Sequence, residues 1–222
     1  MIGSQDWAIE TVEAGAQALH SSDLPARRGV WLMRPTRPAF VLGSSQQAAD
    51  VDADFCARRS IDIARRRSGG GAVLVDPVDS VWIDIVIPRG DSLWVDDVGR
   101  AMHFVGRAWC EALAAMGIGD LAVNEGPHVV NDWSKTLCVA GRGTGEVFVA
   151  TGAKVVGVSQ RRTRSMARFQ CVAFFAWNAE SHLGAMPLLR DDPARVAGLV
   201  NVIPVDDPAH VAARIAAALP VR

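Results

Sequence analysis

Residues 65–76 read RRRSGGGAVLVD, so three arginines lead directly into three glycines and then into an apolar run. Consecutive glycines are expected where the backbone needs positive φ or where a ligand lies close to the chain. Backbone amides in such a turn can bind an anion, and arginine binds phosphate or carboxylate through two parallel hydrogen bonds. We therefore predict a loop that holds an anionic ligand beside a β-sheet. The alternative is an ordinary flexible turn next to a solvated basic face.

The composition is that of a globular protein with a large core. The chain has 222 residues, is 50% hydrophobic and carries a formal net charge of −1. This charge favours neither nucleic acid nor a membrane surface as a partner. No apolar run approaches the length of a membrane-spanning helix. The segment Met1–Asp6 lacks the basic start and apolar core of a signal peptide, so we expect a cytoplasmic protein.

The cysteines and histidines do not form a recognisable metal-binding pattern. Cys56, Cys110, Cys138 and Cys171 are widely spaced, with no Cys-x-x-Cys pair, and the five histidines also lack ligand spacing. We therefore expect reduced thiols and no metal bound by the protein alone.

The hydrophobic pattern predicts helices interspersed with mostly antiparallel strands, which is an α+β fold. Helices are predicted at 7–20, 52–59, 94–116, 188–199 and 207–219. Strands are predicted at 29–33, 39–42, 62–66, 72–75, 81–87, 121–123, 136–140, 146–150, 154–160 and 169–177. We expect the strands at 72–75 and 81–87 to pair with each other, and those at 136–140, 146–150 and 154–160 to form a meander.

A second candidate site residue is Lys154, one of two lysines in a chain that otherwise uses arginine as its cation. It begins an apolar strand, KVVGVSQ. An ammonium group is a compact charge suited to a carbonyl or phosphate oxygen. The alternative is a lysine at the end of a strand that faces water.

Three motifs in this order resemble the lipoate–protein ligase A family. They are PAFVLGSSQ at 38–46, the loop from Arg65 to Asp76, and GAKVVGVSQR at 152–161. That family belongs to a superfamily with octanoyltransferases and biotin–protein ligases. The resemblance implies the mixed sheet and flanking helices of that catalytic domain, here as one domain over residues 1–222. It also implies transfer of a lipoyl or octanoyl group to a lysine of a carrier domain.

The resemblance also implies which residues act. Lys154 would contact the acyl carbonyl and phosphate, and would stabilise charge that develops on oxygen. The substrate or adenylate would be bound by the motif positions Arg65, Arg66, Ser68, Gly69, Gly70, Gly71, Ala72, Asp76, Gly157 and Ser159. A ligase would use lipoate, ATP and Mg²⁺. The partner would be a lipoyl carrier domain of the 2-oxoacid dehydrogenase E2 or glycine cleavage H protein type.

The chain departs from the family pattern in two places. Val75 stands where the family usually has histidine, and residues 77–80 lack the usual Gly-Asn. The residues after Trp177 are too few for the accessory C-terminal domain of the best-known ligases. We therefore expect a single catalytic domain, which would work alone or with a separate accessory chain.

Cys138 keeps a second function open. One class of octanoyltransferase in the superfamily has its nucleophilic cysteine at about this place in the fold. Positive charge from Lys154 and the arginine loop would favour a thiolate at Cys138, which could carry octanoyl from acyl carrier protein as a thioester. The structural alternative is a buried packing thiol. A third possibility, suggested by Val75 and residues 77–80, is a non-catalytic protein that binds lipoate or its adenylate.

Overall fold

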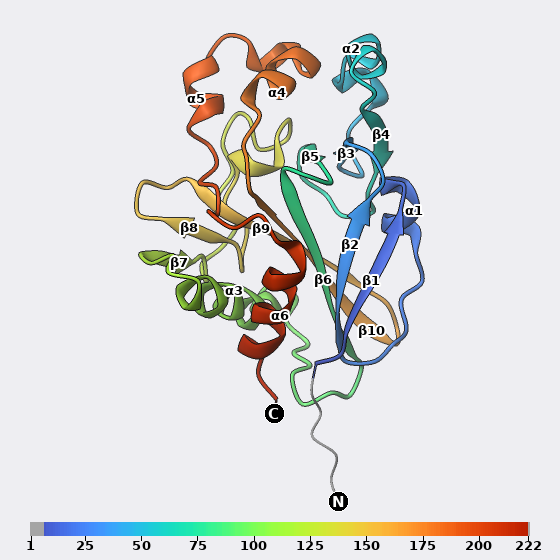
Figure 1. Ribbon diagram of the computed structural model, residues 1–222, viewed down its shortest axis with the longest axis vertical. Helices are drawn as coiled ribbons and strands as arrows, with labels where there is room; N and C mark the ends of the chain where they lie inside the picture. The colour runs from blue at the N-terminus through green and yellow to red at the C-terminus, as the bar shows by residue number, and fades with distance from the viewer. Residues whose placement is uncertain (1–6, 222) are drawn as a thin grey trace, which may run out of the picture.

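The computed structural model describes residues 7–221, and in this range ten β-strands form two sheets (Figure 1). The segment Met1–Asp6, on which we based the expectation of no signal peptide, lies outside the described residues. Within 7–221, no helix has the length and apolar character needed to cross a membrane.

The larger sheet is mixed and mostly antiparallel, which confirms the predicted α+β class. Its strand order is β1 (Ile9–Ala14), β2 (Gly29–Pro35), β6 (Ser80–Pro88), β10 (Met166–Phe174), β9 (Lys154–Arg162), β8 (Val147–Val149) and β7 (Leu121–Val123). The pair β1–β2 is parallel, and the other neighbours are antiparallel.

The smaller sheet carries residues 66–72, which we call the glycine loop below. Its order is β4 (Asp62–Arg65), β3 (Ala39–Leu42) and β5 (Val73–Val75), and the glycine loop connects its two outer strands. The predicted pairing of 72–75 with 81–87 is wrong, because β5 pairs with β3 while β6 lies in the larger sheet. All three residues of β5 are buried. Strand β5 is therefore an edge strand of the smaller sheet and does not form a hairpin with β6.

The helices cover the larger sheet on one face and border the smaller sheet on the other. They are α1 (Ala16–Ser21), α2 (Ala53–Arg58), α3 (His103–Ala115), α4 (Ala179–Ala185), α5 (Pro193–Ala197) and α6 (Pro208–Ala218). Short 3-10 helices are η1 (Ala48–Asp50), η2 (Arg100–Met102), η3 (Cys138–Ala140) and η4 (Pro187–Leu189). Helices α3 and α6 pack together, whereas α2 and α4 lie at the other end of the molecule (Figure 1).

Side-chain alternation along the central strand β6 separates two hydrophobic cores. Ile83, Ile85 and Ile87 pack on the face covered by α3 and α6. Trp82 and Val86 point to the opposite face, toward the smaller sheet and α1. The glycine loop therefore lies on the Trp82 face.

Two of the predicted helices are shorter than their sequence patterns. Residues 9–14 form β1, because β-branched Ile9, Thr11 and Val12 extend alongside β2, and only α1 remains of the helix predicted at 7–20. The helix predicted at 94–116 begins at Arg100. The Asp97 carboxylate accepts a hydrogen bond of 2.8 Å from the Arg100 amide and so starts η2, which α3 continues.

Two other segments differ in type from the prediction. Residues 136–140 are not a strand: they make an isolated bridge to Ala72 and then turn into η3. The helix predicted at 188–199 is divided into η4 and α5, because Asp192 caps the Arg195 amide at 3.0 Å and Pro193 begins a new helix. Helix α4 was not predicted; Asn178 caps it after β10 ends at Phe174.

Candidate functional site

Arg66 holds the glycine loop in shape. Its side chain is buried, and its guanidinium donates to the carbonyl oxygens of Val41 at 3.0 Å, Gly69 at 2.8 Å and Gly71 at 2.7 Å. These acceptors come from β3 and from both sides of the turn. Arg66 therefore uses its hydrogen-bond donors to hold the backbone of the loop. It also lines a cavity that is described below.

Arg65 acts on the neighbouring loop of residues 43–46. Its Nη1 donates to the carbonyl oxygens of Gly43 and Ser44, both at 3.3 Å, and to that of Gln46. The Gln46 side chain in turn accepts from the Gly43 amide at 2.9 Å and donates to the Thr136 carbonyl at 3.2 Å. The motif at 38–46 is thus hydrogen-bonded to Arg65, which precedes the glycine loop, and to Thr136.

The glycines are needed for two different reasons. Gly70 has φ of +92°, a conformation that side chains with a Cβ rarely adopt. Gly71 has no room, because a Cβ there would lie 2.3 Å from the Leu137 amide nitrogen. Gly69, by contrast, faces open space. Close packing at Gly71 fixes the glycine loop against the segment that carries Cys138.

Ala72 connects the glycine loop to this segment through the backbone. Its amide donates to the Thr136 carbonyl at 2.9 Å, and its carbonyl accepts from the Cys138 amide at 2.8 Å. On the other side, the Ser68 hydroxyl lies 3.5 Å from that of Ser159 on β9. The glycine loop, the segment at 136–138 and β9 therefore enclose one space.

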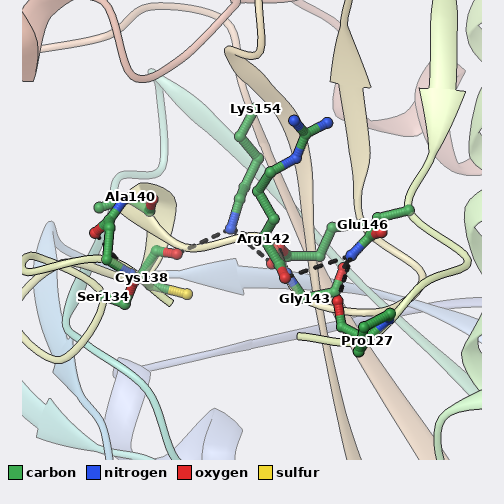
Figure 2. Close-up of polar contacts among 10 residues, drawn as sticks. Pro127, Ser134, Cys138, Ala140, Arg142, Gly143, Glu146 and Lys154 are labelled. Carbon is green, nitrogen blue, oxygen red and sulfur yellow. Dashed lines mark hydrogen bonds and ion pairs between the residues drawn. The ribbon is translucent and has the colours of Figure 1, made fainter. Parts of the chain in front are cut away.

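Lys154 points into this space and is already paired (Figure 2). Its ammonium donates to the Cys138 carbonyl at 2.9 Å and to the Glu146 carboxylate at 2.7 Å. Both side chains of the ion pair are buried, with 3% and 5% of their surface exposed. The Glu146 carboxylate also accepts from the Gly143 amide at 2.5 Å.

The enclosed space is a polar cavity of about 360 Å³. Its lining brings together most of the predicted site residues: Arg66, Ser68, Gly69, Gly70, Cys138, Lys154 and Ser159. Residues that the sequence did not indicate also line it, among them Glu146, His128 and Ser134. We call it the polar cavity below.

A smaller apolar pocket of about 50 Å³ adjoins the polar cavity. The two share four residues: Arg66, Cys138, Val158 and Ser159. Beyond them the pocket is lined by His20, Val73, Val75, Trp82, Gly157, Gln170, Cys171 and Val172. Cys138 therefore lies where an apolar chain in one space would meet a polar group in the other.

Two polar side chains on the lining of the apolar pocket, His20 and Gln170, contact each other. The His20 ring lies 4.3 Å from the Trp82 ring, and its Nδ1 is 3.1 Å from the Gln170 amide nitrogen. Burial, together with the charges of Arg66 and Arg168, lowers the pKa of His20 to about 3, so the imidazole is neutral. A neutral ring suits a pocket whose other walls are apolar.

The other cysteines are less suited to chemistry than Cys138. Burial raises the pKa of the Cys171 thiol, and it also raises those of Cys56 and Cys110. A raised pKa keeps a thiol protonated and unreactive. Cys138 is half-buried on the lining of both spaces.

Four predicted site residues lie outside the lining of both spaces. Arg65 binds residues 43–46, and Gly71 and Ala72 contact the segment at 136–138, as described above. Asp76 lies past β5, where its carboxylate accepts from the amides of Val78 at 2.7 Å and Asp79 at 3.1 Å. It lines a separate cavity of about 150 Å³, which places it away from Lys154.

The sequence carried little signal for the residues that were missed. Glu146 is one of 24 acidic residues and stands in a glycine-rich turn that resembles an ordinary hairpin. Its position eight residues before Lys154, across β8 and β9, was the available hint. His20 and Trp82 come from distant segments, and only the packing of α1 on the larger sheet brings them together.

The polar cavity has no metal site made by protein groups alone. Within residues 7–221, no three His, Cys, Asp or Glu side chains gather to hold an ion. Glu146 is the one carboxylate among the described residues that line the cavity, and it is committed to Lys154. Mg²⁺ bound with ATP does not need such a cluster, because it commonly combines one or two carboxylates with phosphate oxygens and water.

Comparisons with known proteins identify a family and a fold. A family model described as the lipoyl protein ligase A/B catalytic domain matches residues 7–191. A bipartite lipoate protein ligase from Thermoplasma acidophilum, described with its E2 lipoyl domain, has 15% identity and a TM-score of 0.71, and covers 96% of this chain and 82% of that one. No curated protein matches by sequence.

Two further solved structures share the fold and were obtained with ligands. A lipoate-protein ligase A bound with ATP has 17% identity and a TM-score of 0.69, and the match covers 95% of this chain and 82% of that one. LipL1 of P. falciparum in complex with lipoate has 10% identity and a TM-score of 0.64, with 94% and 57% covered.

Proposed function

This chain belongs to the lipoyl protein ligase A/B catalytic domain family, and from that premise we propose that it attaches lipoate to a lysine of a lipoyl carrier domain. In this proposal the lipoate carboxylate attacks the α-phosphate of ATP, which forms lipoyl-adenylate and releases pyrophosphate. The amine of the carrier lysine then attacks the acyl carbonyl and releases AMP. The relatives described with lipoate, with ATP and with an E2 lipoyl domain support this choice of substrates and partner.

The observation that carries the proposal is the junction between the apolar pocket and the polar cavity. An acyl chain in the apolar pocket would place its carboxyl end beside Cys138 and Ser159, where the polar cavity begins. The larger, polar space would then hold the nucleotide part of an adenylate. A chain-shaped apolar ligand with a charged end matches this arrangement.

Lys154 is the group we propose to act on the acyl donor. Lys154 lines the polar cavity and its side chain is buried, and a charge shielded from solvent interacts more strongly than one in water. Its ammonium would donate to the oxygen of the acyl carbonyl or of the adenylate phosphate as negative charge develops there. Mg²⁺ would accompany the ATP phosphates and offset their charge.

The compartment is also part of the proposal. The four cysteines, all within the described residues, form no disulfide. Free thiols suit a reducing environment, so we propose the cytoplasm. We further propose that the lipoyl carrier is of the 2-oxoacid dehydrogenase or glycine cleavage type, and that residues 7–191 form one catalytic domain.

The position of Cys138 favours a second candidate function, octanoyl transfer without ATP. The Cys138 thiolate would attack the thioester carbonyl of octanoyl–acyl carrier protein and release the carrier's thiol. The lysine amine of the lipoyl domain would then attack the enzyme thioester, forming the amide and returning the thiol of Cys138. Its location on both linings is the observation that supports this reaction.

One experiment separates these functions. An apo lipoyl domain is incubated with the protein and either lipoate plus Mg-ATP or octanoyl–acyl carrier protein without ATP, and its mass is measured. Cys138→Ser is compared with Cys110→Ser, whose thiol lies on α3 outside both spaces. We expect modification with lipoate and ATP, and little effect of either variant.

Other outcomes would change the conclusion. Modification only by octanoyl–acyl carrier protein, lost in Cys138→Ser and kept in Cys110→Ser, would establish the transferase. No modification in either reaction, with or without added accessory chain, would contradict both enzymes. Binding of lipoyl-adenylate under those conditions would then identify a non-catalytic binding protein.

A further inference from the structure

The ion pair between Glu146 and Lys154 is the strongest polar feature of the site that the proposed reaction does not explain. Both side chains are almost fully buried, and the ammonium lies 2.7 Å from each carboxylate oxygen (Figure 2). Burying two charges is costly unless their geometry and further hydrogen bonds compensate. Here the Cys138 carbonyl and the Gly143 amide supply those bonds.

Glu146 is itself held from both sides. Its backbone carbonyl accepts from the Asn124 amide at 2.9 Å, next to β7. Its carboxylate binds the Gly143 amide, and the Gly143 carbonyl accepts from the Asn124 side chain at 3.0 Å. The turn at 141–146 is therefore held by bonds that do not involve Lys154, and the Glu146 carboxylate lies on the lining of the polar cavity.

The other charged groups near Lys154 are mostly cationic. The Arg142 guanidinium lies 4.3 Å from the centre of the Phe148 ring, and the Lys154 ammonium lies 5.7 Å from the same ring. Arg66 lines the same cavity. Among the described residues on that lining, Glu146 supplies the one carboxylate that offsets this positive charge.

We infer that Glu146 is a positioning residue for Lys154, an inference that rests on the proposed function. Glu146 fixes the direction of the ammonium. Two N–H bonds point to its carboxylate and to the Cys138 carbonyl, so that the remaining N–H bond is free for the acyl donor.

The pair also affects how the ammonium acts on an acyl donor. With Glu146 in place, Lys154 and its partner have no net charge, so the pair does not act as a general anion trap. The ammonium acts instead as an oriented hydrogen-bond donor to an oxygen that gains charge during the reaction. Removing the carboxylate should therefore impair the chemical step more than it impairs binding of an anionic donor.

The test uses Glu146→Gln, which keeps the shape and one carbonyl acceptor. The matched control is Glu125→Gln, because Glu125 pairs with Arg107 on the surface, outside the site. The chain has only two lysines, so the side chain of Lys154 can be followed by NMR with lysine-labelled protein. Exposed Lys135 is an internal reference.

We expect the side-chain NMR signals of Lys154 to shift and broaden in Glu146→Gln, because the ammonium loses its partner, while those of Lys135 are unchanged. In parallel, kcat for lipoylation should fall about 100-fold with KM for lipoate changed less than about threefold, and Glu146→Asp should recover part of this kcat. Glu125→Gln should match the wild type in both measurements.

The two readouts separate the two claims. If the Lys154 signals are identical in the wild type and in Glu146→Gln, the inference is wrong, whatever the activity. If they differ but the wild type acylates no lipoyl domain with either donor, the proposed function is wrong and the pairing of Lys154 with Glu146 stands. A loss of kcat that is equal in Glu146→Gln and Glu146→Asp would reduce Glu146 to a structural residue.

Discussion

Arg66 donates a hydrogen bond of 2.7 Å to the carbonyl oxygen of Gly71, and through the same nitrogen a second one of 2.8 Å to Gly69. The Arg66 side chain thus bridges two residues of the turn that directly follows it in the sequence. The sequence suggested that this arginine binds the ligand directly. In the structure its first task is to shape the loop, which leaves the exposed loop backbone around Gly69 and Gly70 to approach a ligand.

Arg66→Ala should destabilise the protein strongly, because it leaves three carbonyl acceptors without their donor. We expect a loss of about 3 kcal/mol in the free energy of unfolding and a fall of roughly 6–12 °C in Tm. Arg66→Lys should recover part of this loss, since one ammonium cannot reach all three carbonyls. Denaturant and thermal unfolding test this, and a variant as stable as the wild type would contradict it.

Gly71→Ala should be far more damaging than Gly69→Ala. A Cβ at Gly71 would lie 2.3 Å from the Leu137 nitrogen, whereas none of the neighbouring atoms is within 4 Å of a Cβ at Gly69. We expect about 3 kcal/mol of destabilisation for the first and less than about 0.5 kcal/mol for the second. Equal melting temperatures for the two variants would show that the loop does not pack as described.

Val172→Phe should block the apolar pocket. Val172 lines that pocket and pairs across the sheet with Gly157, so a phenyl ring would occupy the space proposed for the acyl chain. We expect KM for lipoate to rise roughly tenfold or more, with KM for ATP unchanged. Exposed Val78→Phe is the control, and an unaltered KM for lipoate in Val172→Phe would place the acyl chain elsewhere.

Acid should destabilise the protein below neutral pH through its buried histidines. Burial lowers the pKa of His182 to about 4, while an unfolded histidine titrates near 6.5. Between these values the unfolded chain takes up a proton that the folded protein does not, so stability falls as the pH falls. For His182 alone this amounts to about 2 kcal/mol between neutral pH and pH 5.

The matching variant is His182→Gln, which removes one titrating group. Its free energy of unfolding should depend less on pH between 6.5 and 4 than that of the wild type, by about 2 kcal/mol over the interval down to pH 5. Exposed His210→Gln should leave the dependence unchanged. Parallel curves for the wild type and His182→Gln would show that His182 does not cause the acid sensitivity.

Much of the fold was predictable from local patterns. Strand β6 is rich in β-branched residues and β9 begins with a short apolar run, while α2 and α6 begin at aspartates that cap them, Asp52 and Asp207. These signals lie within a few residues of each other. The wrong predictions occurred where contacts with distant segments override the local pattern. Residues 9–14, for example, form β1 because they hydrogen-bond to the backbone of β2.

The sequence by itself indicated a glycine loop and a rare lysine as candidate site residues, because both are unusual in the composition of this chain. Only the tertiary structure decided what each residue does there. It turned Arg66 toward the loop carbonyls, placed Asp76 at another cavity and paired Lys154 with Glu146. The reason is physical: a buried charge must find a partner, and the partner is set by which segments pack together.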